Sequence, residues 1–371
     1  MRNKRFGHID IPLQRVHLEL TNVCDFNCVF CPKSLMKRPY GYMDAALAKR
    51  LIDEISDEGL CEKITFHVMG EPLLHKDFFA ILEHAQNRGV QVGLTTNGGR
   101  LGAEAGIRLL EYPLHQLDIS LQTPDEKSFA LRRAGTLTFG EYLSGIFSFF
   151  AEYHRRHPQT VFKFRFLNTR FPKKPMERRL GPVRVISSTQ ELRATFKYWA
   201  GRVYDGLQTS EAERAQALRE IDKLSAYKWH VVEVAPNVFF ETYILEDWGH
   251  AFGDEKVHDA WGGYCFGMRD HFAVLWNGDV VLCCVDFDGN TVVGNVKDGT
   301  LKEVLSSNAV GTIMDGFRKY RLEHPYCKRC LGSSSRIGWA LKPILAVSGL
   351  KLLKPFFYKK TKLTGTSFRS S

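Results

Sequence analysis

VHLELTNVCDFNCVFCP, at residues 16–32, is the stretch around which the rest of the chain can be interpreted. Its first residues alternate between apolar and polar side chains, which predicts a short strand. The loop after this strand holds three cysteines in the spacing C-x3-C-x2-C, namely Cys24, Cys28 and Cys31. Three soft thiolates so close together cannot all pair as disulfides, and as a set they favour an iron–sulfur cluster, although this spacing alone also allows a zinc site. A four-iron cluster needs one more ligand, so one iron would stay open to a small molecule.

This cysteine loop resembles that of the radical S-adenosylmethionine (SAM) enzymes, which hold a [4Fe-4S] cluster on three cysteines and bind SAM at the fourth iron. The segment Met69-Gly70-Glu71-Pro72 follows the next expected strand and resembles the GGEP stretch of that family, with Met69 in place of the first glycine. The resemblance implies that this loop contacts the amine of SAM, and that later strand ends reach its methionyl and ribose groups. The cofactor-binding residues that it implies are Phe30, Gly70, Glu71, Pro72, Thr96, Asn97 and Ser120.

Strands alternate with helices through much of the chain. Apolar periodicity predicts strands at residues 16–21, 63–68, 90–95, 115–120, 161–167 and 230–234, and helices at 43–58, 78–88, 101–110 and 139–154. This alternation implies parallel pairing with right-handed crossovers. The six units resemble the α/β fold of the radical SAM core, a partial (β/α)6 barrel related to the TIM barrel. Ligands gather at the C-terminal strand ends of such barrels, so we expect the motifs above at one mouth.

A second group of cysteines follows the expected barrel and consists of Cys265, Cys283, Cys327 and Cys330. Residues 271–284 have two apolar segments around Asn277-Gly278, which predicts a β-hairpin. The order Cys265, Gly278, Cys283 resembles the opening of the SPASM extension of radical SAM enzymes. Arg336 stands where a further cysteine would continue that pattern, so the resemblance implies one auxiliary [4Fe-4S] cluster, as in the shorter twitch type. A structural zinc on the same four cysteines is the alternative.

These motifs suggest a division of the chain. We expect a lead-in at 1–15, a radical-SAM-like barrel at 16–240 with a basic helical insertion at 170–228, an auxiliary-cluster domain at 241–335 and a basic amphipathic tail at 336–371. The tail has eight basic and no acidic residues, interspersed with Trp, Leu and Phe. Such a segment suits either an anionic membrane surface or docking on the outside of the barrel.

Composition limits the class of protein further. The chain has 371 residues, 44% of them hydrophobic, and a formal net charge of +10, which fits a globular protein with an acidic partner or surface. Nine cysteines without a secretory signal indicate a reducing compartment, so we expect a cytoplasmic protein whose tail is the candidate for peripheral membrane contact. The sequence contains no run of about 18 apolar residues, so we expect no membrane-spanning helix. No recognition motif outside the tail supports nucleic-acid binding.

The resemblance to radical SAM enzymes also implies a reaction. Such an enzyme cleaves SAM reductively to a 5′-deoxyadenosyl radical, which takes hydrogen from a carbon of the substrate, and a flavodoxin- or ferredoxin-type protein supplies the electron. The single auxiliary cluster favours oxidation of a sugar, an aminocyclitol or a related small molecule, with redox-neutral rearrangement left open. A peptide-modifying maturase and a non-enzymatic, zinc-stabilised binding protein are the alternatives. By position alone, the candidate catalytic residues are Glu19, Lys163 and Arg165.

Overall fold

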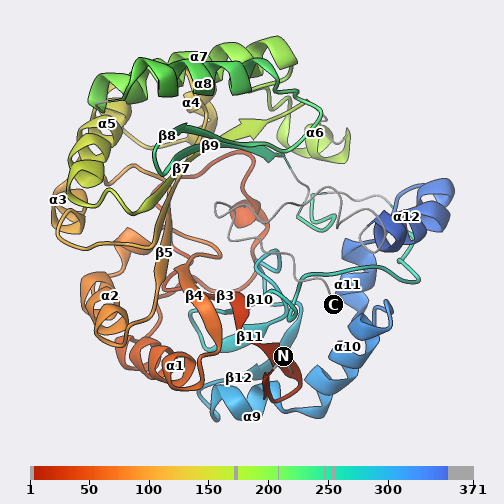
Figure 1. The fold of residues 1–371 in the computed structure, drawn as a ribbon. Coiled ribbons are helices and arrows are strands. Elements are labelled where there is room, and N and C mark those ends of the chain that lie inside the picture. The colour runs from red at the N-terminus through yellow and green to blue at the C-terminus, as the bar shows by residue number, and fades with distance from the viewer. Residues whose placement is uncertain (1–3, 171–173, 208, 246–247, 253–255, 350–371) are drawn as a thin grey trace.

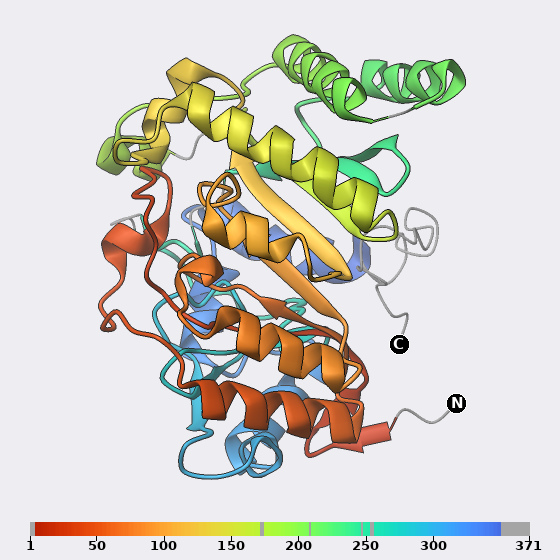
Figure 2. The same cartoon turned by 90° about the vertical axis from the view of Figure 1, so that its left-hand side faces the viewer.

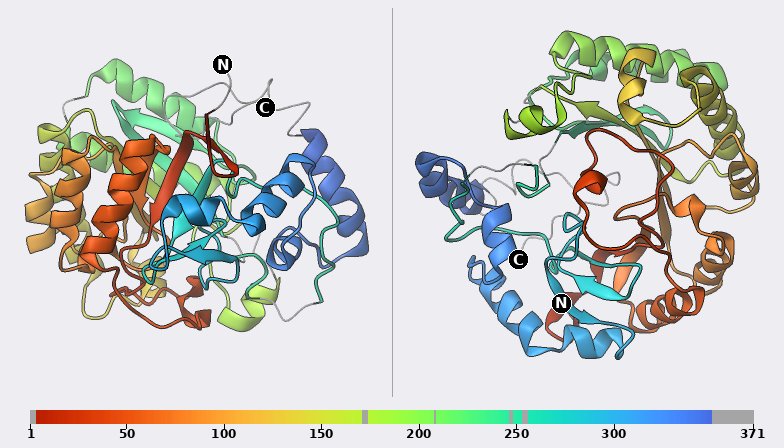
Figure 3. Two further views of the ribbon diagram at one scale, coloured as in Figure 1. Left: turned by 90° about the horizontal axis from the view of Figure 1, so that it is seen from below. Right: turned by 180° about the vertical axis from the view of Figure 1, so that it is seen from behind.

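The computed structural model of the chain describes residues 4–170, 174–207, 209–245, 248–252 and 256–349. Its centre is a ten-stranded sheet with the strand order β12-β11-β10-β3-β4-β5-β6-β7-β9-β8. The strands curve into an open arc with helices along its outside, and the long loop after β3 lies within the arc (Figure 1; from behind, Figure 3). The predicted α/β fold with a partial barrel is confirmed.

Six neighbouring strands of this sheet run parallel to one another. They are β3 (Leu13–Leu18), β4 (Cys61–Phe66), β5 (Val92–Thr96), β6 (Gln116–Gln122), β7 (Val161–Asn168) and β9 (Val238–Ile244). The sixth strand predicted from the sequence, at 230–234, is instead β8 (Val231–Ala235), which runs antiparallel to β9 at the edge of the sheet. Its prediction as a parallel strand was wrong, because the chain reverses at Asn237, where φ is 60°. The strand after this turn, β9, pairs in parallel with β7.

Helices cover the outer face of the parallel strands (Figure 2). The helices of this part of the chain, in order, are α1 (Ala45–Glu58), α2 (Phe78–Asn87), α3 (Glu104–Leu109), α4 (Glu126–Phe129), α5 (Phe139–Arg156), α6 (Lys174–Leu180), α7 (Thr189–Gly206) and α8 (Glu211–Asp222), of which the short α6 lies at the open side of the arc (Figure 1). Local sequence sets their ends. For example, the Asp44 carboxylate accepts hydrogen bonds from the first turn of α1, and Gly59 ends that helix at a φ of 59°. The segment predicted as a helical insertion, 170–228, contains α6, α7 and α8, while residues 171–173 and 208 lie outside the described ranges.

Strand β7 separates apolar from polar side chains. Its buried phenylalanines are Phe162, Phe164 and Phe166. They pack towards the outer helices, where the ring of Phe164 lies 5.4 Å from that of Phe150 on α5. Burying one such side chain stabilises the fold by about 1.5–3 kcal/mol. Since side chains alternate along a strand, Lys163 and Arg165 face the interior of the barrel.

The C-terminal part of the described chain extends the same sheet. Strands β10 (His271–Val274) and β11 (Asp279–Val281) form the predicted hairpin, with Gly278 in the turn at a φ of 93°. Because β10 also pairs in parallel with β3, the hairpin joins the barrel, and β12 (Val292–Asn295) adds the edge. The short strands β1 (Lys4–Phe6) and β2 (Ile9–Ile11) form a separate hairpin. The domain limits given above remain predictions.

Four helices follow the hairpin: α9 (Leu301–Leu305), α10 (Asn308–Arg318), α11 (Pro325–Cys330) and α12 (Arg336–Ser348). Of the predicted basic tail at 336–371, α12 is described, whereas residues 350–371 lie outside the described ranges. Within the part of the chain that the structure describes, no helix combines the length and apolarity needed to cross a bilayer.

Candidate active site

The ends of the first strands and the loop after β3 surround a cavity of about 130 Å³. Its wall contains the three N-terminal cysteines and five other residues predicted from the sequence: Phe30, Gly70, Thr96, Asn97 and Ser120. They come from the C-terminal ends of successive parallel strands, which is where parallel barrels place their ligands. The structure therefore brings most of the predicted cofactor-binding residues to one place.

The three thiols of the N-terminal loop suit a metal cluster. Burial raises the pKa of Cys24 to about 11 and that of Cys31 to about 12, so these thiols would keep their protons unless a metal stabilised the thiolates. The side-chain amide of Asn97 donates to the sulfur of Cys24 at 3.6 Å. Polar donors to the sulfurs of this kind are typical of iron–sulfur sites, so the residues present fit the cluster.

Arg132 supplies a buried positive charge beside these cysteines. Its Nε donates to the sulfur of Cys28 at 3.3 Å, and its Nη1 donates to the carbonyl oxygen of Ser120 at 2.7 Å. The guanidinium carbon also lies 4.8 Å from the ring centre of Phe26. Only 1% of Arg132 is exposed, so its charge acts on the cavity with little screening by solvent.

The GGEP-like loop ties two strand ends together. Oε1 of Glu71 accepts hydrogen bonds from the Thr96 hydroxyl and the Leu73 amide, and Oε2 accepts one from the Asn97 amide at 2.6 Å. Burial raises the pKa of Glu71 to about 7. Gly70 has a φ of 77°, and a Cβ there would lie 2.3 Å from the carbonyl oxygen of Thr21. The loop therefore needs glycine at position 70, whereas Met69 fits at the position where the family motif has its first glycine.

Pro72 begins a short 3-10 turn, Pro72–Leu74, directly after this glutamate. Its fixed φ suits the first position of such a turn, where no backbone N–H is needed. Gly70 lines the cavity, whereas neither Glu71 nor Pro72 does. Glu71 reaches it through its hydrogen bonds to Thr96 and Asn97, and Pro72 shapes the loop.

The C-terminal cysteines also converge. Burial, and then the charge of Cys265, raises the pKa of both the Cys283 and the Cys327 thiols. The backbone packs closely against the group, since a Cβ at Gly249 would lie 3.2 Å from the sulfur of Cys330. Four thiols in one buried group suit either a fully ligated cluster or a structural zinc.

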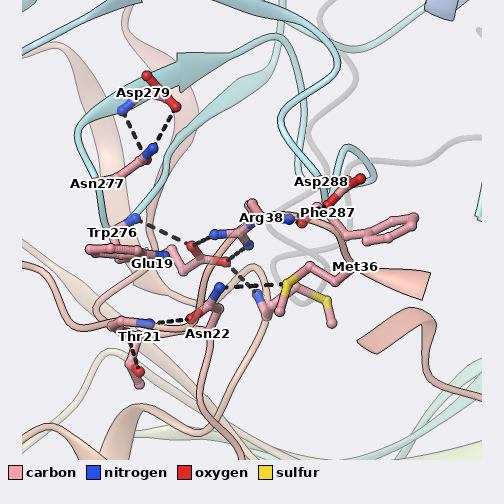
Figure 4. A network of polar contacts seen from close by, with 12 residues as sticks. Glu19, Thr21, Asn22, Met36, Arg38, Trp276, Asn277, Asp279, Phe287 and Asp288 are labelled. Atoms are coloured by element: carbon pink, nitrogen blue, oxygen red, sulfur yellow. Dashed lines mark hydrogen bonds and ion pairs between the residues drawn. The ribbon is translucent and has the colours of Figure 1, made fainter. Parts of the chain in front are cut away.

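Glu19, a candidate catalytic residue, lies in a buried ion pair (Figure 4). The guanidinium of Arg38 bonds both carboxylate oxygens, with Nη1 2.6 Å from Oε2. Backbone amides of Met69 and Trp276 each donate to the same carboxylate at 3.2 Å. The Arg38 amide in turn donates to Asp288. Glu19 thus connects the GGEP-like loop, the segment after the cysteine loop and the turn of the C-terminal hairpin.

The other two catalytic candidates lie in the barrel interior. Arg165 pairs with Asp118 at 2.7 Å and with Glu241 at 3.1 Å. Burial alone would raise the pKa of Asp118, but the charges of Arg165 and Lys163 outweigh it and lower that pKa. Lys63 also lies here, and burial lowers its pKa to about 8. This interior is therefore lined with buried charges of both signs.

Sequence reasoning missed Arg132 and Arg38. Arg132 lies in a short 3-10 turn, Ala130–Arg132, well after its strand end, and no local motif distinguishes it from the neighbouring Arg133. Arg38 lies in an irregular stretch whose partner, Glu19, is 19 positions away. A signal for Glu19 existed, because a lone acid in an apolar strand needs a buried partner, but that signal does not identify the partner.

Comparison with known proteins identifies two parts of the chain. A model of the radical SAM superfamily matches residues 18–153, and a model of the SPASM family, an iron–sulfur cluster-binding domain, matches residues 265–331. The first match covers the three-cysteine loop, the GGEP-like loop and Arg132. The second begins at Cys265 and includes the other three C-terminal cysteines.

Curated relatives match over limited segments. The GTP 3′,8-cyclase of Vibrio cholerae serotype O1 is 34% identical over 138 residues, which are 35% of this chain and 40% of that protein. The S-adenosyl-L-methionine-dependent 2-deoxy-scyllo-inosamine dehydrogenase of Niallia circulans is 40% identical over 63 residues, which are 17% of this chain and 25% of that protein. The chain thus spans less than half the length of these relatives.

Among solved structures, SuiB of Streptococcus suis is similar in fold. It superposes with a TM-score of 0.53 at 13% identity, covering 83% of this chain and 69% of SuiB. The structure of SuiB bound to S-adenosylmethionine gives a TM-score of 0.52 at 15% identity, covering 82% and 69% of the two chains. The arrangement of strands and helices is therefore shared, although few residues are identical.

Proposed function

Because this chain belongs to the radical SAM superfamily and carries a SPASM-type iron–sulfur cluster-binding domain, we propose that it cleaves SAM reductively and oxidises a carbon of a small polar substrate. The two domains imply a [4Fe-4S] cluster with an open iron, an auxiliary cluster and SAM. When bound, the first cluster would supply the electron that splits SAM into methionine and a 5′-deoxyadenosyl radical, which takes hydrogen from the substrate. The grouping of three thiols, a buried glutamate and a buried arginine around one cavity carries this proposal.

The proposal gives each residue of the cavity a role. Cys24, Cys28 and Cys31 hold the cluster. Oε2 of Glu71 receives one hydrogen bond from Asn97, which leaves it able to accept a second from the amine of SAM. Arg132 offers the positive charge that a carboxylate group requires. Cys265, Cys283, Cys327 and Cys330 hold the auxiliary cluster, beside which a substrate could pass on its second electron.

The interior of the barrel supports a polar, small-molecule substrate. The buried Asp118 and Lys163 and the partly buried Arg165 and Glu241 lie on neighbouring strands β6, β7 and β9. Such groups can hydrogen-bond the hydroxyls and amines of a sugar or aminocyclitol, and buried polar groups discriminate strongly against substrates that leave them unpaired. An electron donor of the flavodoxin or ferredoxin type would complete the reaction.

Anaerobic reconstitution tests this function. The reconstituted protein is reduced with dithionite in the presence of SAM, and 5′-deoxyadenosine is measured by mass spectrometry. We expect 5′-deoxyadenosine to form and about eight irons per chain, as two four-iron clusters require. A protein that carries zinc on its C-terminal cysteines and never cleaves SAM would overturn the proposal in favour of a metal-stabilised binding protein.

Deuterium transfer tests the substrate class. Candidate sugars and aminocyclitols deuterated on ring carbons, and deuterated peptides in parallel, are incubated with the enzyme and SAM. Label that appears in 5′-deoxyadenosine only with the sugar-like compounds supports the proposal, because the abstracted atom enters that product. Label from the peptides alone would instead identify a peptide-modifying enzyme.

We also propose that α12 and the basic residues after it contact an anionic membrane surface. Helix α12 exposes Ile337, Leu341 and Leu345, with 74%, 50% and 66% of these side chains accessible. The helix is held to the body by Trp339, whose indole donates to the carbonyl oxygen of Asp259. Exposed apolar residues next to basic ones suit an interfacial helix. Co-sedimentation with anionic liposomes should fall when residues 336–371 are removed, and equal binding would disprove the contact.

A further inference from the structure

A third group of metal-ligand side chains lies inside the barrel, in addition to the seven cysteines discussed above. His17 on β3, His271 on β10 and Cys284 after β11 offer ligand atoms that all lie within 4.8 Å of one another. His271 Nε2 is 3.8 Å from the sulfur of Cys284. The rings of the two histidines have centroids 5.3 Å apart and are almost perpendicular. The group exists because β10 pairs with β3, which places one histidine from each strand in the interior.

The ring nitrogens of these histidines are not all satisfied by the protein. His17 Nδ1 lies 2.6 Å from the hydroxyl of Thr65, while His17 Nε2 is buried with no hydrogen-bond partner among the described residues. The same is true of His271 Nδ1. A buried polar atom without a partner costs about 1–3 kcal/mol. His17, which bonds Thr65 through Nδ1 and leaves Nε2 free, has the arrangement found in metal sites, while His271 faces Cys284 through Nε2.

The charges around the group also fit a metal ion. Burial lowers the pKa of His17 well below its usual value and that of His271 to about 3, and Arg15 acts in the same direction on both. Both imidazoles are therefore neutral, which is the form that binds metals. Because Arg15 would repel a cation, a dication here needs the negative charge of the Cys284 thiolate.

We propose that His17, His271 and Cys284 bind one zinc ion inside the barrel, separate from both iron–sulfur clusters. Two imidazoles and a thiolate are ligands that zinc takes in sites with three protein ligands, where the fourth position holds water or a substrate atom. His67, whose ring centroid is 6.1 Å from that of His17, lines the cavity described above. The zinc would therefore lie next to the space where a substrate reacts, and its open position suits a hydroxyl or amine.

Zinc loading of the reconstituted protein tests the site, because the clusters then occupy the other cysteines. The protein is incubated with zinc sulfate, desalted, and analysed for metals by mass spectrometry and for zinc ligands by X-ray absorption. We expect about one zinc per chain, with nitrogen ligands at about 2.0–2.1 Å and a single sulfur at about 2.3 Å. If the zinc has four sulfur ligands, or if the protein retains no zinc, the proposal is wrong, and the wild-type protein alone is enough to show this.

Variants identify the ligands. Cys284→Ser and His271→Gln should each lose the zinc while the iron content stays unchanged. Cys61→Ser is the matched control, since Cys61 is a partly buried thiol at the start of β4, and it should keep the zinc. Thr65→Val should weaken zinc binding by about 10–100-fold, as expected for a group that orients a ligand.

Two results would refute the site. Loss of iron from Cys284→Ser would show that this thiol serves the auxiliary cluster, and equal zinc in Cys284→Ser and Cys61→Ser would show that Cys284 is not a zinc ligand. Circular dichroism confirms that each variant is folded.

Discussion

The two cysteine sites differ in the number of thiols and in what shares the space with them. Around the three N-terminal cysteines there is a cavity, with the buried charged groups of Arg132 and Glu71 beside it. Around the four C-terminal cysteines the backbone packs closely, as at Gly249 against Cys330. A site with one ligand too few and a cavity can admit a small molecule, whereas a fully ligated site encloses its metal. Under the proposed function, this difference places the chemical step at the first site and a supporting electronic role at the second.

Removing one thiol from the first site should have the largest effect. In Cys28→Ala, 5′-deoxyadenosine formation should fall to the level of an enzyme-free control, because the cluster and its open iron are lost. The iron content should drop by about four per chain. Cys61→Ala, which removes a thiol that begins β4 and does not line the cavity, should keep SAM cleavage. Unchanged turnover in Cys28→Ala would refute the proposed function.

Removing one thiol from the second site should separate the two roles. In Cys283→Ala we expect loss of about four irons per chain and loss of substrate oxidation, while SAM cleavage continues. The measured quantities are iron, 5′-deoxyadenosine and oxidised product in the same samples. If SAM cleavage disappears as completely as in Cys28→Ala, the two sites are not independent and the comparison fails.

The pH dependence of SAM binding should report on Glu71. Burial raises the pKa of this carboxyl from its usual acidic range to about 7, so it is protonated below that pH and ionised above it. The amine of SAM prefers the ionised form, and the dissociation constant should therefore increase about tenfold for each pH unit below 7 and level off above it. Calorimetry of the reconstituted protein measures this. Glu71→Gln should bind SAM weakly at every pH, and an equally steep pH dependence in that variant would assign the titration to another group.

Much of the fold could be predicted because the parallel strands carry strong local signals. The alternation in β7 and the Asn277-Gly278 turn of the hairpin each follow from a few neighbouring residues. The prediction failed at β8, where the choice between parallel and antiparallel pairing depends on the turn at Asn237 and on the next strand. Likewise, nothing in the sequence of β10 indicates that it pairs with β3, because that contact joins residues more than 250 positions apart.

The site shows the same division between local and distant information. The N-terminal cysteine loop and the GGEP-like loop are local motifs, and the structure brings both to the cavity. Arg132 is not part of a local motif, and its role depends on the approach of the turn that carries it to Cys28. For Lys163 and Arg165, the sequence shows that they share one face of their strand. It does not show whether that face points into the barrel or towards the helices.

Glu19 connects the N-terminal and the C-terminal cysteine regions. Replacing it is therefore the most stringent test of whether these two regions act as one unit. Its carboxylate accepts hydrogen bonds from the amide of Met69, which lines the cavity, and from the amide of Trp276, in the hairpin that leads to Cys283. Glu19→Gln keeps the size of the side chain but leaves Arg38 buried without its counter-charge. Breaking a buried ion pair in this way costs about 3–5 kcal/mol, so we expect a clearly lower melting temperature in anaerobic calorimetry.

The matched control is Glu152→Gln, because Glu152 pairs with Arg155 and Arg156 on the outer surface of α5, where solvent screens the charges. That variant should melt close to the wild-type temperature. Below its melting temperature, Glu19→Gln should still cleave SAM, since a residue that only holds two regions together does not take part in the chemical step. If Glu19→Gln instead abolishes cleavage with an unchanged melting temperature, then Glu19 is a catalytic residue, as its position in the sequence first suggested.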